Sequence, residues 1–231
     1  MDKKQAQLIL DKIVGQIFGY KNPYDLDSFQ SKFAFDIILP KKVSDHSTGK
    51  DTWARSTNPS KFMTIESIIS RSELDDWMVP KRQFSDINDI LEAWNNINMM
   101  VSERQIDSVN LAESDNIYNS ENVFRSQDCY SSKKILFCEG VRSCEFVSAS
   151  RGSGNSTYCI RIEDSSNCNK SFAVSWSSKV SNSFLIQDCH DISDCMLCSH
   201  IKSKRFCIAN MQFSENEYNQ LKEVIINWIL N

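Results

Sequence analysis

Small and apolar residues recur at every third position through the second half of the chain. From Ser108 to Cys207, each third residue is Ser, Cys, Ile, Leu or Val, with Lys204 as the one exception. An α-helix repeats every 3.6 residues and a flat strand every 2, so neither explains a strict repeat of three. Collagen needs Gly at each third place, and this chain has 6 Gly in all. The pattern therefore predicts a β-solenoid in which one residue in three points inward.

Aligning the repeat in rows of twelve residues predicts the length of one coil. Aliphatic residues then share a column, and turn-forming residues fill two others, where Asn, Asp and Gly favour bends. The aliphatic column holds Leu111, Val123, Ile135 and Val147, and the turn columns hold Asn119, Ser131, Ser143, Asn155 and Asn167, and Asn116, Asp128, Gly140, Gly152 and Asp164. We expect coils of about twelve residues with two corners. A coil of eighteen residues keeps the repeat but scrambles these columns, and it is the alternative.

Residues 1–100 lack the repeat and are expected to form a separate α+β region. Apolar residues at helical spacing predict an amphipathic helix over 5–18. An apolar run ahead of a proline predicts a strand over 33–39, and the polar composition of 41–61 predicts a long loop. The solenoid is expected to follow over 101–213.

Further helices are predicted from their capping residues. Ser72 precedes a group of acids, Glu73, Asp75 and Asp76, typical of a solvated helix start. Ser85 can cap a helix that carries Ile87, Ile90, Leu91 and Trp94.

The last 18 residues, 214–231, are expected to form a C-terminal capping helix. Ser214 and Glu217 match a capping box. The apolar residues that follow, on one predicted side, are Leu221, Val224, Ile225, Trp228 and Ile229. Because an open coil edge recruits other strands, this helix is expected to cover the last coil, and the N-terminal region to close the other end.

One outward column of the predicted solenoid is almost wholly apolar. This apolar ladder consists of Ala112, Phe124, Leu136, Ser148, Ile160, Phe172, Phe184, Met196 and Ile208. Stacked strands lie about 4.8 Å apart, so the column would form a continuous apolar strip, and such strips usually mark contacts. We predict that its large members, Phe124, Leu136, Ile160, Phe172, Phe184, Met196 and Ile208, bind a partner protein or a second copy of the chain. The alternative is that the N-terminal region packs over them.

Composition gives little indication of a charged or lipid partner. The net charge is −4, and the one basic group, Lys133, Lys134 and Arg142, is too sparse to track phosphates, so no nucleic acid is expected. No apolar stretch is long enough to cross a bilayer, and residues 1–5 do not resemble a signal peptide. We expect a cytoplasmic protein without a membrane partner.

The nine cysteines all obey the three-residue repeat, so we expect them to be buried thiols of the solenoid interior. A zinc site is the alternative, since Cys189, Cys195, Cys198 and Cys207 lie close in sequence to His190 and His200, but the spacing is not that of a zinc finger. Cys189 and His190 should point to opposite sides, which argues against a nucleophile and its base. No catalytic residue, metal ligand or cofactor is predicted.

Two other stretches have a structural interpretation. The Gly/Ser-rich segment 151–156 lacks the Lys and the helix of a phosphate-binding loop, and we interpret it as a bulged corner. Asp45 and His46 lie in a polar loop without a motif.

The solenoid resembles two sets of proteins. Its twelve-residue coil with inward Cys and Ser is similar in architecture to insect antifreeze proteins. Its tail resembles uncharacterised cysteine-rich proteins of small-genome bacteria and phages, through the phrases Asp194-Cys195-Met196-Leu197-Cys198, Lys204-Arg205-Phe206-Cys207-Ile208 and Glu215-Asn216-Glu217-Tyr218. The second resemblance implies a solenoid fold, a phage or mobile-element origin, and location in a host cytoplasm or a virion.

The function expected from these patterns is a non-enzymatic scaffold for protein–protein contacts, such as a virion part or an inhibitor of a host protein. An enzymatic or small-molecule-binding domain over 1–100, carried on a solenoid that oligomerises, is a second hypothesis. A zinc-binding structural protein is a third.

Overall fold

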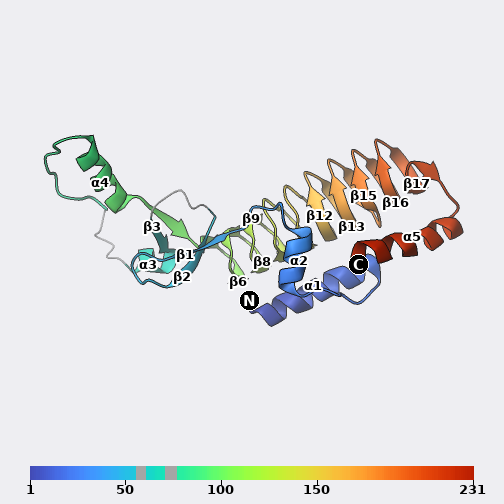
Figure 1. Ribbon diagram of the computed structural model, residues 1–231, viewed down its shortest axis with the longest axis horizontal. Coiled ribbons are helices and arrows are strands. Elements are labelled where there is room, and N and C mark those ends of the chain that lie inside the picture. Colours follow the sequence, from blue (N-terminus) through green and yellow to red (C-terminus); the bar gives the residue numbers. More distant parts are fainter. Residues whose placement is uncertain (56–60, 71–76) are drawn as a thin grey trace.

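A computed structural model describes residues 1–55, 61–70 and 77–231 and shows a long β-solenoid with helices along one face and a smaller lobe at one end (Figure 1). The solenoid strands are β5 (Gln105–Ile106), β6 (Val109–Ala112), β7 (Asp115–Tyr118), β8 (Glu121–Phe124), β9 (Gln127–Tyr130), β10 (Lys133–Leu136), β11 (Glu145–Ser148), β12 (Thr157–Glu163), β13 (Ser166–Ser175), β14 (Ser178–Ser181), β15 (Phe184–Gln187), β16 (His190–Ser199) and β17 (Lys202–Ile208). They stack in parallel, and Lys133 pairs with Glu145 and Ile135 with Val147, twelve residues on. The predicted solenoid and its twelve-residue coil are thus confirmed, over about nine coils.

Each coil turns at four residues in the left-handed region. From Asp107 to Ala209 every third residue has a positive φ, and Gly140 and Gly152 belong to the same series. The residue after each left-handed one points inward, and from Ser114 to Cys198 all inward residues are buried. The sequence interpretation placed corners in two of these columns and missed the other two.

Inward hydroxyl groups connect one coil to the next. The Ser120 hydroxyl donates to the Tyr118 carbonyl at 2.7 Å and accepts the Ser132 amide at 3.1 Å. The same arrangement recurs at Ser126, whose hydroxyl donates to the Phe124 carbonyl and accepts the Cys138 amide. An inward Ser therefore satisfies buried backbone groups that would otherwise lose their hydrogen bonds, which explains why small polar residues alternate with aliphatic ones inside a narrow core.

The edge of the last coil is protected by exposed charged residues and by a short hairpin. Lys204, the exception to the three-residue repeat, is exposed on β17, in a run of exposed residues over 202–205. No inward packing is required there, because no coil follows, and charged residues on an edge discourage further strand pairing. β18 (Met211–Gln212) pairs antiparallel with the end of β17.

Three helices from the two ends of the chain lie along one side of the solenoid. They are α1 (Lys3–Phe18), α2 (Leu26–Phe33) and α5 (Glu215–Leu230). α1 and α5 meet end to end beneath the coils, so both termini lie on this side (Figure 1). The Tyr24 hydroxyl donates to the Leu230 carbonyl at 2.6 Å, and Tyr20 hydrogen-bonds Glu223. The predicted helix over 5–18 and the capping box of Ser214 and Glu217 are confirmed.

The remaining N-terminal residues form a lobe at the first coil. It contains β1 (Lys41–Ser44), β2 (Asp51–Ala54), β3 (Lys61–Thr64), α3 (Ile65–Ile69), α4 (Ile87–Ile97) and β4 (Met99–Ser102). β1 pairs with β2 antiparallel, and β3 with β4 parallel. Asp115 of the solenoid is fully buried and accepts hydrogen bonds from Arg104 and from the Arg55 amide, which ties the lobe to the rod.

Several local predictions are wrong. Residues 33–39 were expected to form a strand, but Phe33 ends α2, where it packs against Phe29, and irregular chain follows with Phe35 exposed. The expected loop over 41–61 contains the β1–β2 hairpin. Asp86, not Ser85, caps α4. The helix start expected at Glu73, Asp75 and Asp76 lies outside the described residues.

The bulged corner expected over 151–156 is also wrong. Arg151 forms backbone β-bridges with Glu139 on one side and Glu163 on the other, and Gly154 forms them with Arg142 and Ser166. The twelve-residue register therefore continues without an inserted residue over this described stretch. Gly152 takes one of the left-handed positions, where an added Cβ would lie 2.2 Å from Asp164 Oδ1. The Asp164 side chain of the next coil occupies that space and would have to turn away from an alanine at this position.

Candidate functional site

The apolar ladder lies inside the protein. Phe124, Leu136, Ile160, Phe172, Phe184, Met196 and Ile208, the predicted partner-binding residues, are all at most 8% exposed. They share one core with the inner faces of α1, α2 and α5. Phe18 of α1 contacts the rings of Phe172 and Phe184, each at 5.5 Å between centroids, and Phe33 of α2 contacts Phe172 at 5.6 Å.

The arrangement corresponds to the alternative in which the N-terminal region packs over the ladder, with α5 completing the cover. Lys222 of α5 lies over the Phe184 ring at 5.5 Å. A partner protein would reach these seven side chains only after the helices had left. A docking surface must therefore be sought elsewhere.

The nine cysteines are buried free thiols. Each inward sulfur lies near the carbonyl two residues earlier, as in the contact of 3.2 Å from Cys189 Sγ to the Gln187 oxygen. Burial raises the pKa of Cys129 and Cys159 well above the usual value and that of Cys168 to about 11. These thiols are protonated at neutral pH, and they act as small core side chains that also hydrogen-bond.

The four cysteines nearest the C-terminus all lie in the solenoid interior. The hydrogen bond between Cys195 and Cys198 raises the pKa of Cys195 and lowers that of Cys198, but both sulfurs are buried and closed to a substrate. His190 Nδ1 lies 2.7 Å from the Ser178 hydroxyl, on the outside of the coil, away from Cys189. Within the described ranges, no group of three His, Cys, Asp or Glu side chains is placed to hold a metal ion.

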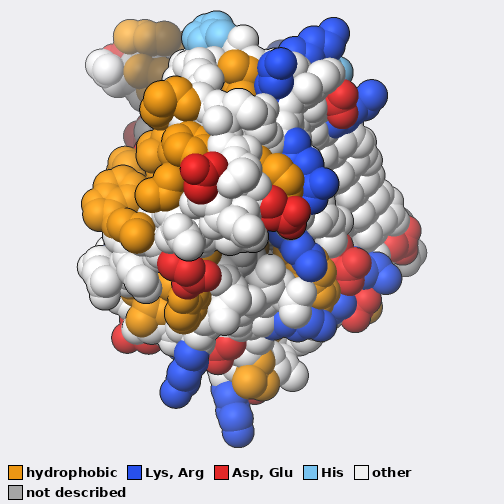
Figure 2. Space-filling model, turned by 90° about the vertical axis from the view of Figure 1, so that its right-hand side faces the viewer, with side chains coloured by type: hydrophobic (Ala, Val, Ile, Leu, Met, Phe, Trp, Pro, Cys, Tyr) orange, Lys and Arg blue, Asp and Glu red, His pale blue; other side chains and the backbone are white. Residues whose placement is uncertain are grey.

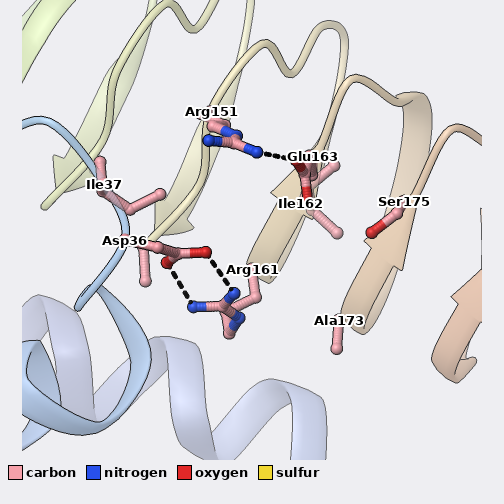
Figure 3. A pocket seen from close by; sticks show the side chains of 9 residues that line it. Asp36, Ile37, Arg151, Arg161, Ile162, Glu163, Ala173 and Ser175 are labelled. Carbon is pink, nitrogen blue, oxygen red and sulfur yellow. Dashed lines mark hydrogen bonds and ion pairs between the residues drawn. The ribbon is translucent and has the colours of Figure 1, made fainter.

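A small pocket of about 120 Å³ lies where the chain after α2 meets the solenoid (Figure 3). Asp36 accepts two hydrogen bonds from the Arg161 guanidinium, at 2.8 and 2.9 Å, and Arg151 pairs with Glu163. Arg161 also donates to the Phe33 carbonyl at 2.6 Å. The Arg161 hydrogen bonds lower the pKa of Asp36. Both guanidinium groups already have carboxylate partners. The contacts of Arg161 with Phe33 and Asp36 therefore attach α2 to the solenoid.

Asp45, noted in the sequence as part of a polar pair without a motif, organises the lobe. Its carboxylate is 1% exposed and accepts hydrogen bonds from the Thr64 amide at 2.7 Å, the Ser67 hydroxyl at 2.8 Å and the Thr48 amide at 2.9 Å. Burial alone would raise its pKa, but these hydrogen bonds outweigh burial and hold the pKa well below the usual range. The group is structural, because its oxygens are occupied by donors of its own lobe.

α4 carries an exposed apolar surface. We define the α4 apolar face as Ile87, Ile90, Leu91, Trp94 and Ile97, which are between 43% and 62% exposed. No residue of this helix is buried by any described part of the chain. Val79 and Phe84, also exposed, continue this surface and line a groove of about 430 Å³ beside α4.

Sequence reasoning found this helix but not the exposure of its apolar side. Four of the five residues were recognised as helical, yet a helical apolar stripe is normally a core stripe. The available signal was the lack of a second strong apolar segment nearby, since 41–61 is polar and the aliphatic residues after 108 are committed to the solenoid interior.

A second exposed apolar stripe lies on α5. The helix buries Tyr218, Ile226 and Ile229, whereas Leu221, Val224 and Trp228, predicted on the packed side, are 40%, 65% and 68% exposed. The packed face is rotated from the predicted one because α5 approaches the last coil through Tyr218, whose ring contacts Phe206 at 5.5 Å. Figure 2, seen from this end, shows hydrophobic side chains gathered along one side and charged ones along the other.

Comparison with known proteins gives no match to a family model, to a curated protein or to a solved structure. The longest helices, α1 and α5, have 16 residues each, and no helix in the described part of the chain combines the length and apolar character needed to span a bilayer.

Proposed function

We propose that the protein is a non-catalytic scaffold whose solenoid holds the α4 apolar face outward for a protein partner. The observation that carries this proposal is that all five apolar side chains of α4 are exposed, although the helix is clearly amphipathic. Exposed apolar patches larger than about 300–600 Å² mark contact sites on soluble proteins.

The length of α4 supports this proposal. A helix of 11 residues is too short to be stable in water without packing, since isolated helices below about 12–15 residues are marginal. α4 has an N-cap at Asp86 and an ion pair between Arg82 and Asp89 at 2.5 Å, and such surface interactions contribute little. Burial of its apolar face against a partner would supply the missing stabilisation.

The placement of α4 also suits a scaffold. α4 lies at the end of the molecule farthest from α5, projecting beyond the coils (Figure 1). The stacked strands and the inward serine hydroxyls that join successive coils favour a stiff rod, so a partner bound at α4 would lie at the opposite end of the molecule from α5. Such a role needs surface area and no chemistry, in keeping with the buried thiols and the satisfied carboxylates. A phage or mobile-element setting within a host cytoplasm or virion, from the tail resemblance, belongs to the same proposal.

Affinity capture from native host cells with matched variants tests the scaffold role. Leu91→Glu with Trp94→Glu alters the α4 apolar face, and Val224→Glu with Trp228→Glu makes the same kind of change on α5. We expect a partner that is retained by the unmodified chain and the α5 variant, and reduced at least about tenfold by the α4 variant, because central aromatic and aliphatic anchors dominate interfaces. Identical capture by all three proteins would overturn the proposal.

A further inference from the structure

We propose that the lobe binds a free amino acid, or a molecule with the same zwitterionic group, in a polar pocket beside the first coil. The pocket has a volume of about 320 Å³ and lies where three segments meet, namely the turn between β1 and β2, α3, and the link from β4 into the first coil. Ligand sites occur preferentially at such junctions. The pocket is separate from the α4 apolar face, so this site goes beyond the scaffold role and does not depend on it.

Glu103, in the link from β4, supplies a carboxylate that lacks a cation. Its side chain is half-buried, and this burial raises its pKa. The Thr52 hydroxyl and the Trp53 amide act in the opposite direction, but none of the groups that shift the pKa is a cation. A half-buried carboxylate without an opposite charge is costly, so Glu103 would gain from the ammonium group of a ligand.

Lys50 supplies the opposite charge from the turn between β1 and β2. Its backbone is fixed, because its carbonyl accepts the Asp45 amide at 2.8 Å and its amide donates to the Thr48 hydroxyl at 3.3 Å. Its ammonium group forms no ion pair within the described part of the chain, whereas Lys42 pairs with Asp51 at 2.7 Å. Asp51 also lines the pocket, so one of the pocket's acids is already neutralised by the protein.

The hydroxyl groups of the pocket divide into two that are fully used and two that keep free capacity. The Thr64 hydroxyl donates to that of Ser67, which in turn donates to Asp45. The Thr48 hydroxyl accepts a backbone amide and keeps its own hydrogen, and the Ser70 hydroxyl donates to the Ser67 carbonyl and keeps its lone pairs. The pocket can therefore still donate to a ligand carboxylate and accept from a ligand ammonium group.

The charges of the pocket favour a zwitterion over a simple ion. Glu66, in the first turn of α3, adds a second carboxylate that has no ion pair among the described residues. A simple cation would satisfy the two acids and leave Lys50 unpaired, whereas a simple anion would be repelled by them. A metal ion is a poor occupant, since no three His, Cys, Asp or Glu side chains in the described ranges are placed to hold one. A molecule with an ammonium and a carboxylate on one carbon atom satisfies both signs at once.

Thermal-shift and calorimetric measurements on the full chain test the proposal. A screen of the standard free amino acids identifies the one that raises the Tm most, because a ligand that binds only the folded state stabilises it. Isothermal titration calorimetry then compares that amino acid with its carboxamide, which lacks the carboxylate, and with its N-acetyl derivative, which lacks the ammonium group. We expect each derivative to bind at least about tenfold more weakly, because each loses one charge-assisted contact.

Two variants assign the two charges to their residues. Lys50→Met should weaken binding of the amino acid about tenfold and leave binding of the carboxamide unchanged, whereas Glu103→Gln should weaken both. Lys41→Met is the matched control, since Lys41 is exposed on β1 outside the pocket lining, and it should change neither. Circular dichroism verifies that each variant is folded.

The possible outcomes are distinct from those of the scaffold test. Binding of an amino acid that Lys50→Met and Glu103→Gln both weaken, and Lys41→Met does not, supports the site. A chain that no standard amino acid stabilises, or binding that neither pocket variant alters, overturns it. Equal binding of the amino acid and its carboxamide overturns the role of Lys50 and with it the zwitterion. Host-cell capture that depends on α4 would uphold the scaffold in each of these cases.

Discussion

Two apolar surfaces of this protein differ in what covers them. The apolar ladder is a strip of strand residues along the solenoid, and α1, α2 and α5 cover it so that every member except the half-buried Ala112 is buried. The α4 apolar face has similar residue types, yet every one of its five side chains is about half exposed. Apolar composition alone therefore does not tell a docking surface from a core surface. What decides is whether the chain supplies a matching cover.

The cover of the ladder is drawn from both ends of the chain. α1 and α2 precede the lobe, and α5 follows the last coil, and together they match a strip many coils long. α4 instead projects beyond the first coil (Figure 1). Charged substitutions should therefore lower the unfolding free energy strongly at the ladder and leave it almost unchanged at α4.

The largest effect is expected at the ladder. Phe172→Asp with Phe184→Asp should destabilise the protein by more than about 6 kcal/mol, because each change removes a buried ring and buries a carboxylate. Urea denaturation followed by circular dichroism measures the loss. With typical stabilities of about 5–15 kcal/mol, the variant should be largely unfolded without denaturant.

The matched control is Ile90→Asp with Leu91→Asp on α4. Both side chains are already 43% and 47% exposed, so we expect a change in the unfolding free energy within about 1 kcal/mol at low protein concentration. If the ladder variant instead stayed folded and the α4 variant unfolded, the assignment of core and docking surface would be reversed.

A smaller loss of stability is expected for a change inside the solenoid. There the inward hydroxyl groups join successive coils, which should stay rigid without the covering helices. Ser126→Ala removes the hydroxyl that joins the Phe124 carbonyl to the Cys138 amide and leaves both groups buried without that partner. We expect a loss of about 1–3 kcal/mol in urea denaturation.

Ser126→Cys is the control for this change. Cys already stands in the same column at Cys138 and Cys198, where it contacts the equivalent carbonyl, so we expect a loss below about 1 kcal/mol. Equal losses for the two variants would show that the volume of the side chain matters and its hydrogen bond does not.

The sequence predicted the solenoid because its interior imposes a strict spacing. One residue in three must be small or aliphatic, and Lys204 departs from that rule only where the stack ends and no packing is required. The C-terminal helix was predicted for a similar reason, since a capping box is a local signal between Ser214 and Glu217.

All four left-handed columns of the coil are encoded in the sequence, and two of them were overlooked. From 107 to 209, no position in that class holds Val, Ile, Thr or Pro, and many hold Asn or Asp. Branched side chains are strained in the left-handed region, whereas Asn and Asp tolerate it. Large residues such as Phe137 and Trp176 obscured the pattern, because they adopt positive φ there despite the cost.

The burial of the ladder and the exposure of α4 could not be predicted from the sequence. Both segments show apolar residues at regular spacing, and the difference depends on contacts between parts of the chain that are far apart, such as Phe18 with Phe184. A local pattern carries no information on whether a distant helix will pack over it. For that reason the residues predicted to bind a partner are buried, and the exposure of the predicted helix at 87–97 was not foreseen.

The smallest effect is expected at a corner of the solenoid. Gly140 and Gly152 both have positive φ, so replacement by Ala costs about 1–2 kcal/mol at either site, offset in part by a stiffer unfolded chain. An added Cβ at Gly140 meets its nearest neighbour at 3.7 Å, whereas at Gly152 it would lie 2.2 Å from Asp164 Oδ1. Gly152→Ala should therefore be the more destabilising of the two in urea denaturation.

Because the obstacle at Gly152 is a side chain, a second change should relieve it. Gly152→Ala combined with Asp164→Ala should recover most of the difference from Gly140→Ala, since the added Cβ then keeps only an ordinary contact with the Cα of residue 164 at 3.5 Å. Without recovery, the strain would lie in the backbone of the corner and not in the contact between coils. Recovery would instead show that the side chain stacked from the next coil decides which residue fits at this corner. The covering helices likewise decide which residues fit at the ladder.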